Sequence, residues 1–217
     1  MENSIKNESY WLKLFPVIVW HILYLFFCNL FDKYTRVYFD LIFYLGIACY
    51  FFLFRDWRFS EWNKSIKKGR SFWFPVMFTI LGMALMFVIG VGITILLKNM
   101  NDGMAVFGVN SWATLCAFAV VTILLPPISE EAFYRKAIIS FDSKIVILIS
   151  TIVSVLLYAS EHSLMPVGLL QASLWAVPLS IAYIKTKDIY VCMTAHFICN
   201  LLINGMTVVG SAIRLAG

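Results

Sequence analysis

Three short segments in the second half of the chain hold polar residues spaced four apart. They read EEAFYR from residue 130, YASEH from residue 158 and HFICN from residue 196. Residues four apart lie on one face of a helix, so Glu131 is expected beside Arg135 and His196 beside Asn200. Carboxylates and imidazoles move protons, and imidazole and amide groups donate hydrogen bonds to a developing oxyanion. The three segments therefore predict acid–base hydrolysis of a carbonyl compound.

Glu130 is the candidate general base among these residues. The charges of Glu131 and Arg135 can compensate each other, whereas Glu130 is rotated by about 100° on the helix and has no partner there. A carboxylate without a partner can take a proton from water. His162 can share that water with Glu130.

The composition makes these charges informative. Hydrophobic residues form 61% of the chain and charged residues only 13%. A carboxylate in hydrocarbon costs on the order of 3 kcal/mol, so an adjacent pair such as Glu130 and Glu131 indicates a functional site.

The elements that must position these residues are membrane spans. The mean hydropathy is +0.84, and a soluble domain carries about 25% charge. A span needs about 20 apolar residues, and hydropathy predicts about seven such segments in an all-α, polytopic helical bundle. They are 12–31, 37–54, 72–97, 111–137, 143–163, 167–184 and 188–209.

A proline pair interrupts the fourth of these segments. Pro126 and Pro127 precede the glutamates, and proline breaks or kinks a helix. We expect a broken helix with Ser129 as the N-cap of its second half, lining a cavity.

The chain is expected to form one membrane domain, with residues 1–110 lacking any motif and residues 111–217 forming the catalytic core. Lysines and arginines favour the cytoplasmic side. If the basic stretch 55–71 is cytoplasmic, alternating spans place thirteen basic residues inside and four outside. This predicts a multi-pass protein of the cell membrane with its N-terminus in the cytoplasm. The stretch 55–71 is interpreted as a solvated loop, with a short helix on anionic lipid as the alternative.

Several other polar or reactive residues are assigned no chemistry. The five cysteines lack CxxC spacing and are interpreted as small apolar residues. His21 is interpreted as packing or an interhelical hydrogen bond, and Glu161 as a solvated group near a helix end. No cleavable signal peptide is expected, because the first ten residues are polar and mixed in charge.

In order, the three motifs resemble the CPBP family of CAAX-protease and bacteriocin-processing intramembrane proteases, also called Abi proteins. That family shows EExxxR, FxxxH and HxxxN or HxxxD on consecutive membrane segments, and the resemblance covers roughly residues 111–205. Tyr158 stands where the family has phenylalanine, which retains the ring and adds a hydroxyl group.

The resemblance also implies roles for the site residues. Glu130 would activate water with help from His162, and His196 with Asn200 would stabilise the tetrahedral intermediate. Glu131 would support the site and Arg135 would anchor it. Glutamate-activated water is the favoured mechanism. Zinc is left open, with Glu131, His162 and His196 as its ligands if a metal takes part, because the chain lacks HExxH.

The expected partners are the lipid bilayer and a peptide or membrane-protein substrate. The net charge of +5 needs no nucleic acid, because the basic residues follow the positive-inside rule. The main alternative is a non-catalytic immunity or regulatory protein that binds its partner on the same fold. A transporter is a third interpretation, disfavoured by the lack of an inverted repeat and the single acidic cluster.

Overall fold

The computed structural model describes residues 2–97 and 100–217, with the side chains of the first helix described at residue 12 and from residue 14 onward. Every regular element in these two ranges is helical, which confirms the predicted all-α class. The elements are α1 (Glu2–Phe27), η1 (Cys28–Leu30), α2 (Arg36–Leu53), α3 (Phe59–Ile66), α4 (Arg70–Leu96), α5 (Trp112–Ala119), η2 (Val120–Leu124), α6 (Pro126–Glu130), η3 (Glu131–Ala137), α7 (Lys144–His162), α8 (Pro166–Thr186) and α9 (Ile189–Ala216).

Six helical stretches in the described ranges are long and apolar enough to cross a membrane. They are Arg36–Leu53, Arg70–Leu96, Trp112–Ala137, Lys144–His162, Pro166–Thr186 and Ile189–Ala216. The first predicted span corresponds to a shorter apolar helical stretch, Leu14–Leu30. Helices satisfy their own backbone hydrogen bonds in lipid, so this set of helices is that of a multi-pass membrane protein.

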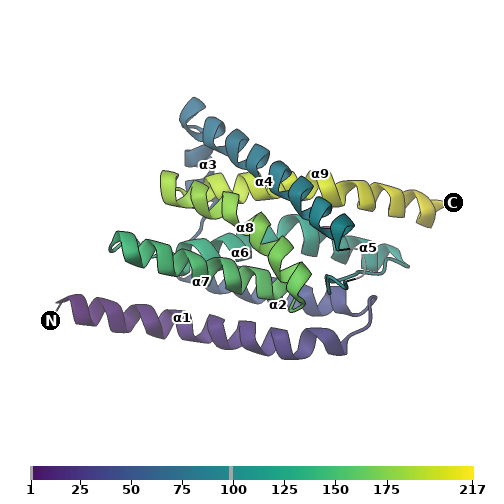
Figure 1. Ribbon diagram of the computed structural model, residues 1–217, viewed down its shortest axis with the longest axis horizontal. Coiled ribbons are helices and arrows are strands. Elements are labelled where there is room, and N and C mark those ends of the chain that lie inside the picture. Colours follow the sequence, from purple (N-terminus) through teal and green to yellow (C-terminus); the bar gives the residue numbers. More distant parts are fainter. Residues whose placement is uncertain (1, 98–99) are drawn as a thin grey trace.

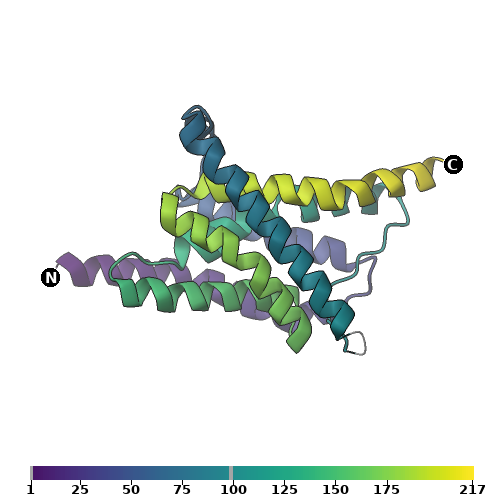
Figure 2. The same cartoon turned by 45° about the horizontal axis from the view of Figure 1, so that its top comes forward.

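The helices form a bundle with α8 near its centre (Figures 1 and 2). α8 packs against α7, α4 and α9, and α4 crosses α8 and α9 obliquely, while α1 runs along the opposite side. Within the apolar windows of these helices, 56% of α8 is buried but only 17% of α4. A helix that is apolar all round and mostly exposed faces lipid. α8 is therefore a core helix, and α4 lies at the rim.

The proline pair bends the fourth span without ending it. α5, η2, α6 and η3 follow one another from Trp112 to Ala137 with a bend only at Leu125. η2 and η3 are wider π-helical turns, in which the Leu125 N–H donates to the Val120 carbonyl. Such turns accommodate inserted residues and often occur at functional sites.

The predicted N-cap role of Ser129 is wrong. Pro126 occupies the first turn of α6, where its missing N–H costs nothing. The Ser129 hydroxyl instead donates to the Leu125 carbonyl at 2.8 Å, inside the helical path. A side chain that bonds the preceding turn cannot cap the next one.

The fifth span extends further than its neighbours. Sequence distances alone place His162 about 27 Å along the helix from Lys144, deeper than the other motif residues. In both ribbon views the start of α7 extends beyond the start of α9 along the long axis of the molecule. This offset allows His162, the last residue of α7, to reach the depth of the other motifs.

The basic stretch 55–71 contains a helix that packs on the bundle. The indole N–H of Trp62, in α3, donates to Thr194 Oγ1 at 2.8 Å. Ser65 and Lys68 both reach Asp188 Oδ2, at 2.8 and 2.6 Å. The interpretation as a plain solvated loop is therefore wrong for residues 59–66, while its contact with lipid stays a prediction.

The predicted orientation depends partly on residues outside the described set. The side chains of Lys6 and Lys13 and all of Lys98 lie there. The structure includes no membrane, so the placement of the N-terminus stays a prediction.

Gly168, in the first turn of α8, lies against the connection that follows α4. A Cβ atom there would lie 1.9 Å from the Asp102 carbonyl oxygen and 2.6 Å from Ser163. We expect Gly168→Ala to lower the free energy of unfolding by about 2 kcal/mol or more, because backbone must shift. Thermal unfolding in detergent measures this. Gly92→Ala is the control, since nothing lies within 4 Å of its Cβ position; equal melting temperatures for the two variants would contradict the prediction.

Candidate active site

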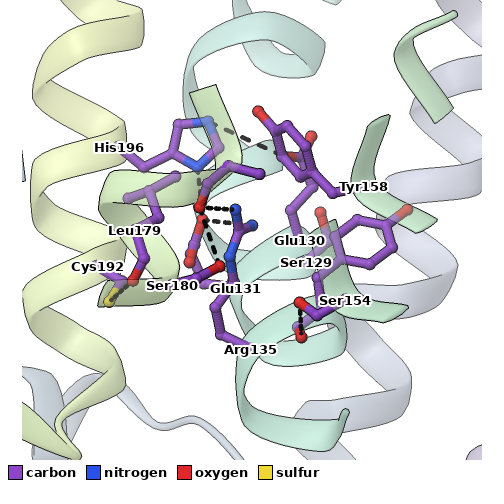
Figure 3. Close-up of polar contacts among 12 residues, drawn as sticks. Ser129, Glu130, Glu131, Arg135, Ser154, Tyr158, Leu179, Ser180, Cys192 and His196 are labelled. Carbon is purple, nitrogen blue, oxygen red and sulfur yellow. Dashed lines mark hydrogen bonds and ion pairs between the residues drawn. The ribbon is translucent and has the colours of Figure 1, made fainter. Parts of the chain in front are cut away.

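The predicted site residues come from three helical paths, and Figure 3 shows Glu130, Glu131, Arg135, Tyr158 and His196 side by side. Glu130 ends α6, and Glu131 and Arg135 lie in η3. α7 supplies Tyr158 and His162, and α9 supplies His196 and Asn200.

Arg135, Glu131 and His196 form a buried chain of polar contacts. The Arg135 guanidinium donates to Glu131 Oε1 at 3.1 Å, and His196 Nδ1 lies 2.8 Å from the same oxygen. Arg135 also donates to the Ala176 carbonyl at 3.4 Å and lies over the Tyr158 ring at 4.5 Å. Arg135 and Glu131 are both 0% exposed, so every donor and acceptor in this chain depends on protein partners.

This chain sets the proton positions on His196. A carboxylate paired with a guanidinium accepts hydrogen bonds, so Nδ1 of His196 carries a proton and donates to Glu131. The other ring nitrogen, Nε2, lies 3.9 Å from Glu130 Oε2. Glu131 therefore orients the imidazole, and Nε2 is directed at Glu130, as Figure 3 shows.

Glu130 contrasts with its neighbour. It is 2% exposed, and its Oε2 atom has no hydrogen-bond partner. Glu131 bonds Arg135 and His196 through Oε1, whereas Glu130 Oε2 lies 3.9 Å from His196 Nε2. Of the two adjacent carboxylates, Glu130 is the one that lines the cavity described below.

A cavity of about 700 Å³ adjoins these groups. Its lining includes all of the predicted site residues except Glu131 and Arg135, which lie behind the wall: Glu130, Tyr158, His162, His196 and Asn200. A cavity of this size accommodates a small ligand or a few peptide residues. The arrangement can thus hold a carbonyl group near a carboxylate base and two hydrogen-bonding side chains.

His162 is held by its own helix. Its Nδ1 atom lies 3.0 Å from the Tyr158 carbonyl, to which it donates. Its ring lies 4.4 Å from the Tyr158 ring and meets the Trp175 ring edge to face. These contacts fix the tautomer, so Nε2 of His162 is the nitrogen available to the cavity.

Comparison with known proteins identifies the segment that carries this site. Residues 111–202 match the family model described as Type II CAAX prenyl endopeptidase Rce1-like. This segment of 92 residues, out of 217 in the chain, is similar to Rce1-like endopeptidases. No curated protein and no solved structure matches the chain significantly. The expected resemblance to CAAX-type proteases is thereby confirmed for residues 111–202.

The matched segment contains all seven residues that the motifs predicted for the site. The matched model describes an endopeptidase, so the similarity of this segment points to the peptidase class. The helices of residues 12–96 lie outside the match.

The donor set proposed for zinc does not fit a metal. Among the residues that the structure describes, no group of three or more His, Cys, Asp or Glu side chains is arranged to hold an ion. Glu131 Oε1 already contacts Arg135 and His196, so this oxygen is not available to an ion. We derive no step through a metal.

The interpretation of Glu161 as a solvated group is wrong. Its side chain is 4% exposed, lines the same cavity and accepts hydrogen bonds from the hydroxyl groups of Tyr44 and Tyr134. Sequence reasoning missed it because these partners lie on other elements of the matched segment and on α2. The only signal was its place beside His162.

His21 joins the same network, as predicted for an interhelical hydrogen bonder. Its Nδ1 atom lies 3.2 Å from the Tyr134 hydroxyl and its Nε2 atom 3.2 Å from Ser160 Oγ. Glu161, Tyr134 and His21 thus connect α7 and η3 to α1.

We expect Glu161→Ala to destabilise the protein by about 2 kcal/mol, because two buried tyrosine hydroxyl groups lose their partner. Glu161→Gln retains an oxygen acceptor for Tyr44 and an amide donor for the oxygen of Tyr134, so its melting temperature should stay near that of the wild type. Thermal unfolding of both variants tests this. If the glutamine variant unfolds as early as the alanine variant, the network does not stabilise the fold in this way.

Proposed function

We propose that the chain is an intramembrane endopeptidase that uses Glu130 to activate water and cleaves a membrane-associated peptide or protein. The observation that carries this proposal is the buried Glu130 carboxylate, whose Oε2 atom has no hydrogen-bond partner, in a cavity shared with His162, His196 and Asn200. The Rce1-like match supports the reaction class.

In the proposed reaction, Glu130 takes a proton from a water molecule positioned with help from His162. The water oxygen attacks the scissile carbonyl carbon, and the C–N bond breaks as the amine leaves with a proton returned by Glu130. Each proton taken up is thus given back within one turnover.

The oxyanion would be stabilised by Asn200 and His196. The Asn200 amide donates directly. His196 already donates from Nδ1 to Glu131, so it donates from Nε2 only when the ring carries a second proton. Glu131, held in place by Arg135, orients the His196 ring towards the cavity, which is how these two residues would support catalysis.

The proposed setting is the cell membrane, with the N-terminus in the cytoplasm and residues 1–110 serving as spans that complete the bundle. Peptide or bacteriocin maturation, self-immunity and processing of a membrane regulator are the roles that such an activity fits. The glutamates lie close to Lys136 in sequence, so water would enter from the cytoplasmic side.

The experiment that tests the function is cleavage of a fluorogenic peptide library by the purified protein in detergent. Glu130→Gln and His196→Ala are assayed beside the wild type, each with and without chelator. Cleavage that is lost in both variants establishes the protease, and the chelator decides whether a metal takes part. If no sample cleaves any peptide while both variants function in cells, the chain is a binding protein on a protease fold.

A further inference from the structure

The cavity wall holds more carboxyl groups than the proposed reaction needs. Besides Glu130, its wall includes Asp40 from α2 and Glu161 from α7. No lysine or arginine lines it in the described part of the chain. Hydrolysis requires one carboxylate base, so the other two carboxylates have no assigned role in the chemistry.

The buried cations do not balance these charges. Asp40, Glu130, Glu131 and Glu161 are each at most 4% exposed. Arg135 is already paired with Glu131. Arg36 approaches Asp40 Oδ2 only at 3.9 Å, beyond hydrogen-bond distance, and its side chain is 12% exposed. Four buried carboxylates therefore face two guanidinium groups.

Asp40 is the least satisfied of the carboxylates with no part in the proposed reaction. It is 2% exposed, and its Oδ1 atom has no hydrogen-bond partner. Glu161, by contrast, accepts from two tyrosine hydroxyl groups. A buried carboxylate atom without a donor is costly, and a donor supplied by a ligand removes that cost.

Much of the remaining cavity lining is apolar. α4 contributes Met83 and Phe87, and the connection after it contributes Met104 and Phe107. Lysine and arginine side chains place a hydrocarbon stem along such surfaces while the charged end reaches a polar group. The cavity thus combines apolar surface for a side-chain stem with a carboxylate for its charged end.

From this arrangement we propose that Asp40, assisted by Glu161, forms a subsite that binds a lysine or arginine side chain of the peptide substrate. The proposal rests on the proposed protease function and adds a substrate class to it. The basic side chain donates to Asp40 Oδ1 and offsets the charge of both carboxylates, while the scissile bond lies at Glu130. The chain would therefore select peptides that are apolar with one basic residue at a fixed distance from the cleaved bond.

The test measures binding separately from cleavage. The full-length Glu130→Gln variant in detergent is titrated into short apolar fluorescent peptides that carry one lysine, arginine, norleucine or glutamate at each position in turn. We expect one position at which lysine or arginine binds at least tenfold tighter than norleucine, which is about 1.4 kcal/mol. Glutamate at that position should bind more weakly than norleucine.

Asp40→Asn, added to the same variant, should reduce the lysine-to-norleucine ratio at least fivefold. Asp32→Asn is the matched control. It removes a carboxylate just before α2 that is exposed and bonds only Tyr34 and Thr35 among the described contacts, so the ratio should stay unchanged. If Asp40→Asn fails to fold, Glu161→Gln serves as the second variant. The glutamate peptides still show whether the subsite disfavours a negatively charged side chain.

The outcomes separate the subsite from the protease. Equal binding of lysine, norleucine and glutamate peptides at every position, or no binding of any, overturns the subsite even if the wild type cleaves. Selective binding of basic peptides without cleavage by the wild type supports the subsite and overturns the protease.

Discussion

Replacing Glu130 with glutamine is expected to lower kcat for peptide cleavage by about a thousandfold. General acid–base catalysis contributes about 10² to 10⁴ to the rate, and the amide cannot take a proton from water. Glutamine has nearly the same shape, and none of the hydrogen bonds that join Arg135, Glu131 and His196 involves Glu130. The change therefore removes the base without disturbing the groups around it.

The stability of the Glu130→Gln variant provides an independent check. Because the substitution replaces a buried carboxylate whose Oε2 atom has no hydrogen-bond partner, we expect a melting temperature equal to or above that of the wild type. Catalytic carboxylates commonly cost stability in this way. Glu61→Gln is the control, since Glu61 is exposed and pairs with Lys64 on α3. A Glu130→Gln protein that retains more than about a tenth of the wild-type rate would show that another group is the base.

The sequence was sufficient to predict the pairs that a single helix dictates. The spacing of Glu131 and Arg135 predicted their contact, and the structure has it at 3.1 Å. The membrane spans could be predicted equally well, since a run of about 20 apolar residues without charge has few alternatives to a membrane helix.

Contacts between different helices could not be predicted from the sequence in this way. Glu161 lies 117 residues from Tyr44 and 27 from Tyr134 along the chain. No pattern in the neighbouring sequence predicts partners at such separations. The same holds for His196, whose Nδ1 contact to Glu131 spans 65 residues. That contact constrains His196 as an oxyanion donor, because only a doubly protonated ring has Nε2–H as well. The chemistry of a site thus depends on contacts between side chains of different helices, which the residue spacing within one helix does not predict.

The prediction that Ser129 caps a helix was wrong for a physical reason. A proline pair followed by serine and two glutamates is a typical helix start, and a helix that truly ended at Leu125 would need that cap. The bundle instead continues through wide turns on both sides of α6, so the serine hydroxyl bonds backward to Leu125. Tertiary packing against α2 and α9 outweighed the local signal.

The largest effect on stability is expected from Arg135→Met. Removing one partner of a buried ion pair leaves the other charge uncompensated, which costs about 3–5 kcal/mol. Arg135 is 0% exposed, and its loss would leave Glu131 with only His196 as a partner. The stacking of the guanidinium on Tyr158 would be lost as well. We expect the variant to unfold well below the wild type in thermal or SDS titration.

The double variant Glu131→Gln with Arg135→Met isolates the charge. If the uncompensated carboxylate is the cause, the double variant should recover most of the stability lost by Arg135→Met alone, because a neutral amide no longer needs a cation. It should remain inactive, because the ion pair that orients the His196 ring is removed. Lys64→Met, at a side chain that is 71% exposed, should change stability by less than about 0.5 kcal/mol. A double variant no more stable than Arg135→Met would mean that packing against Tyr158 and Ala176, and not charge pairing, is what Arg135 contributes.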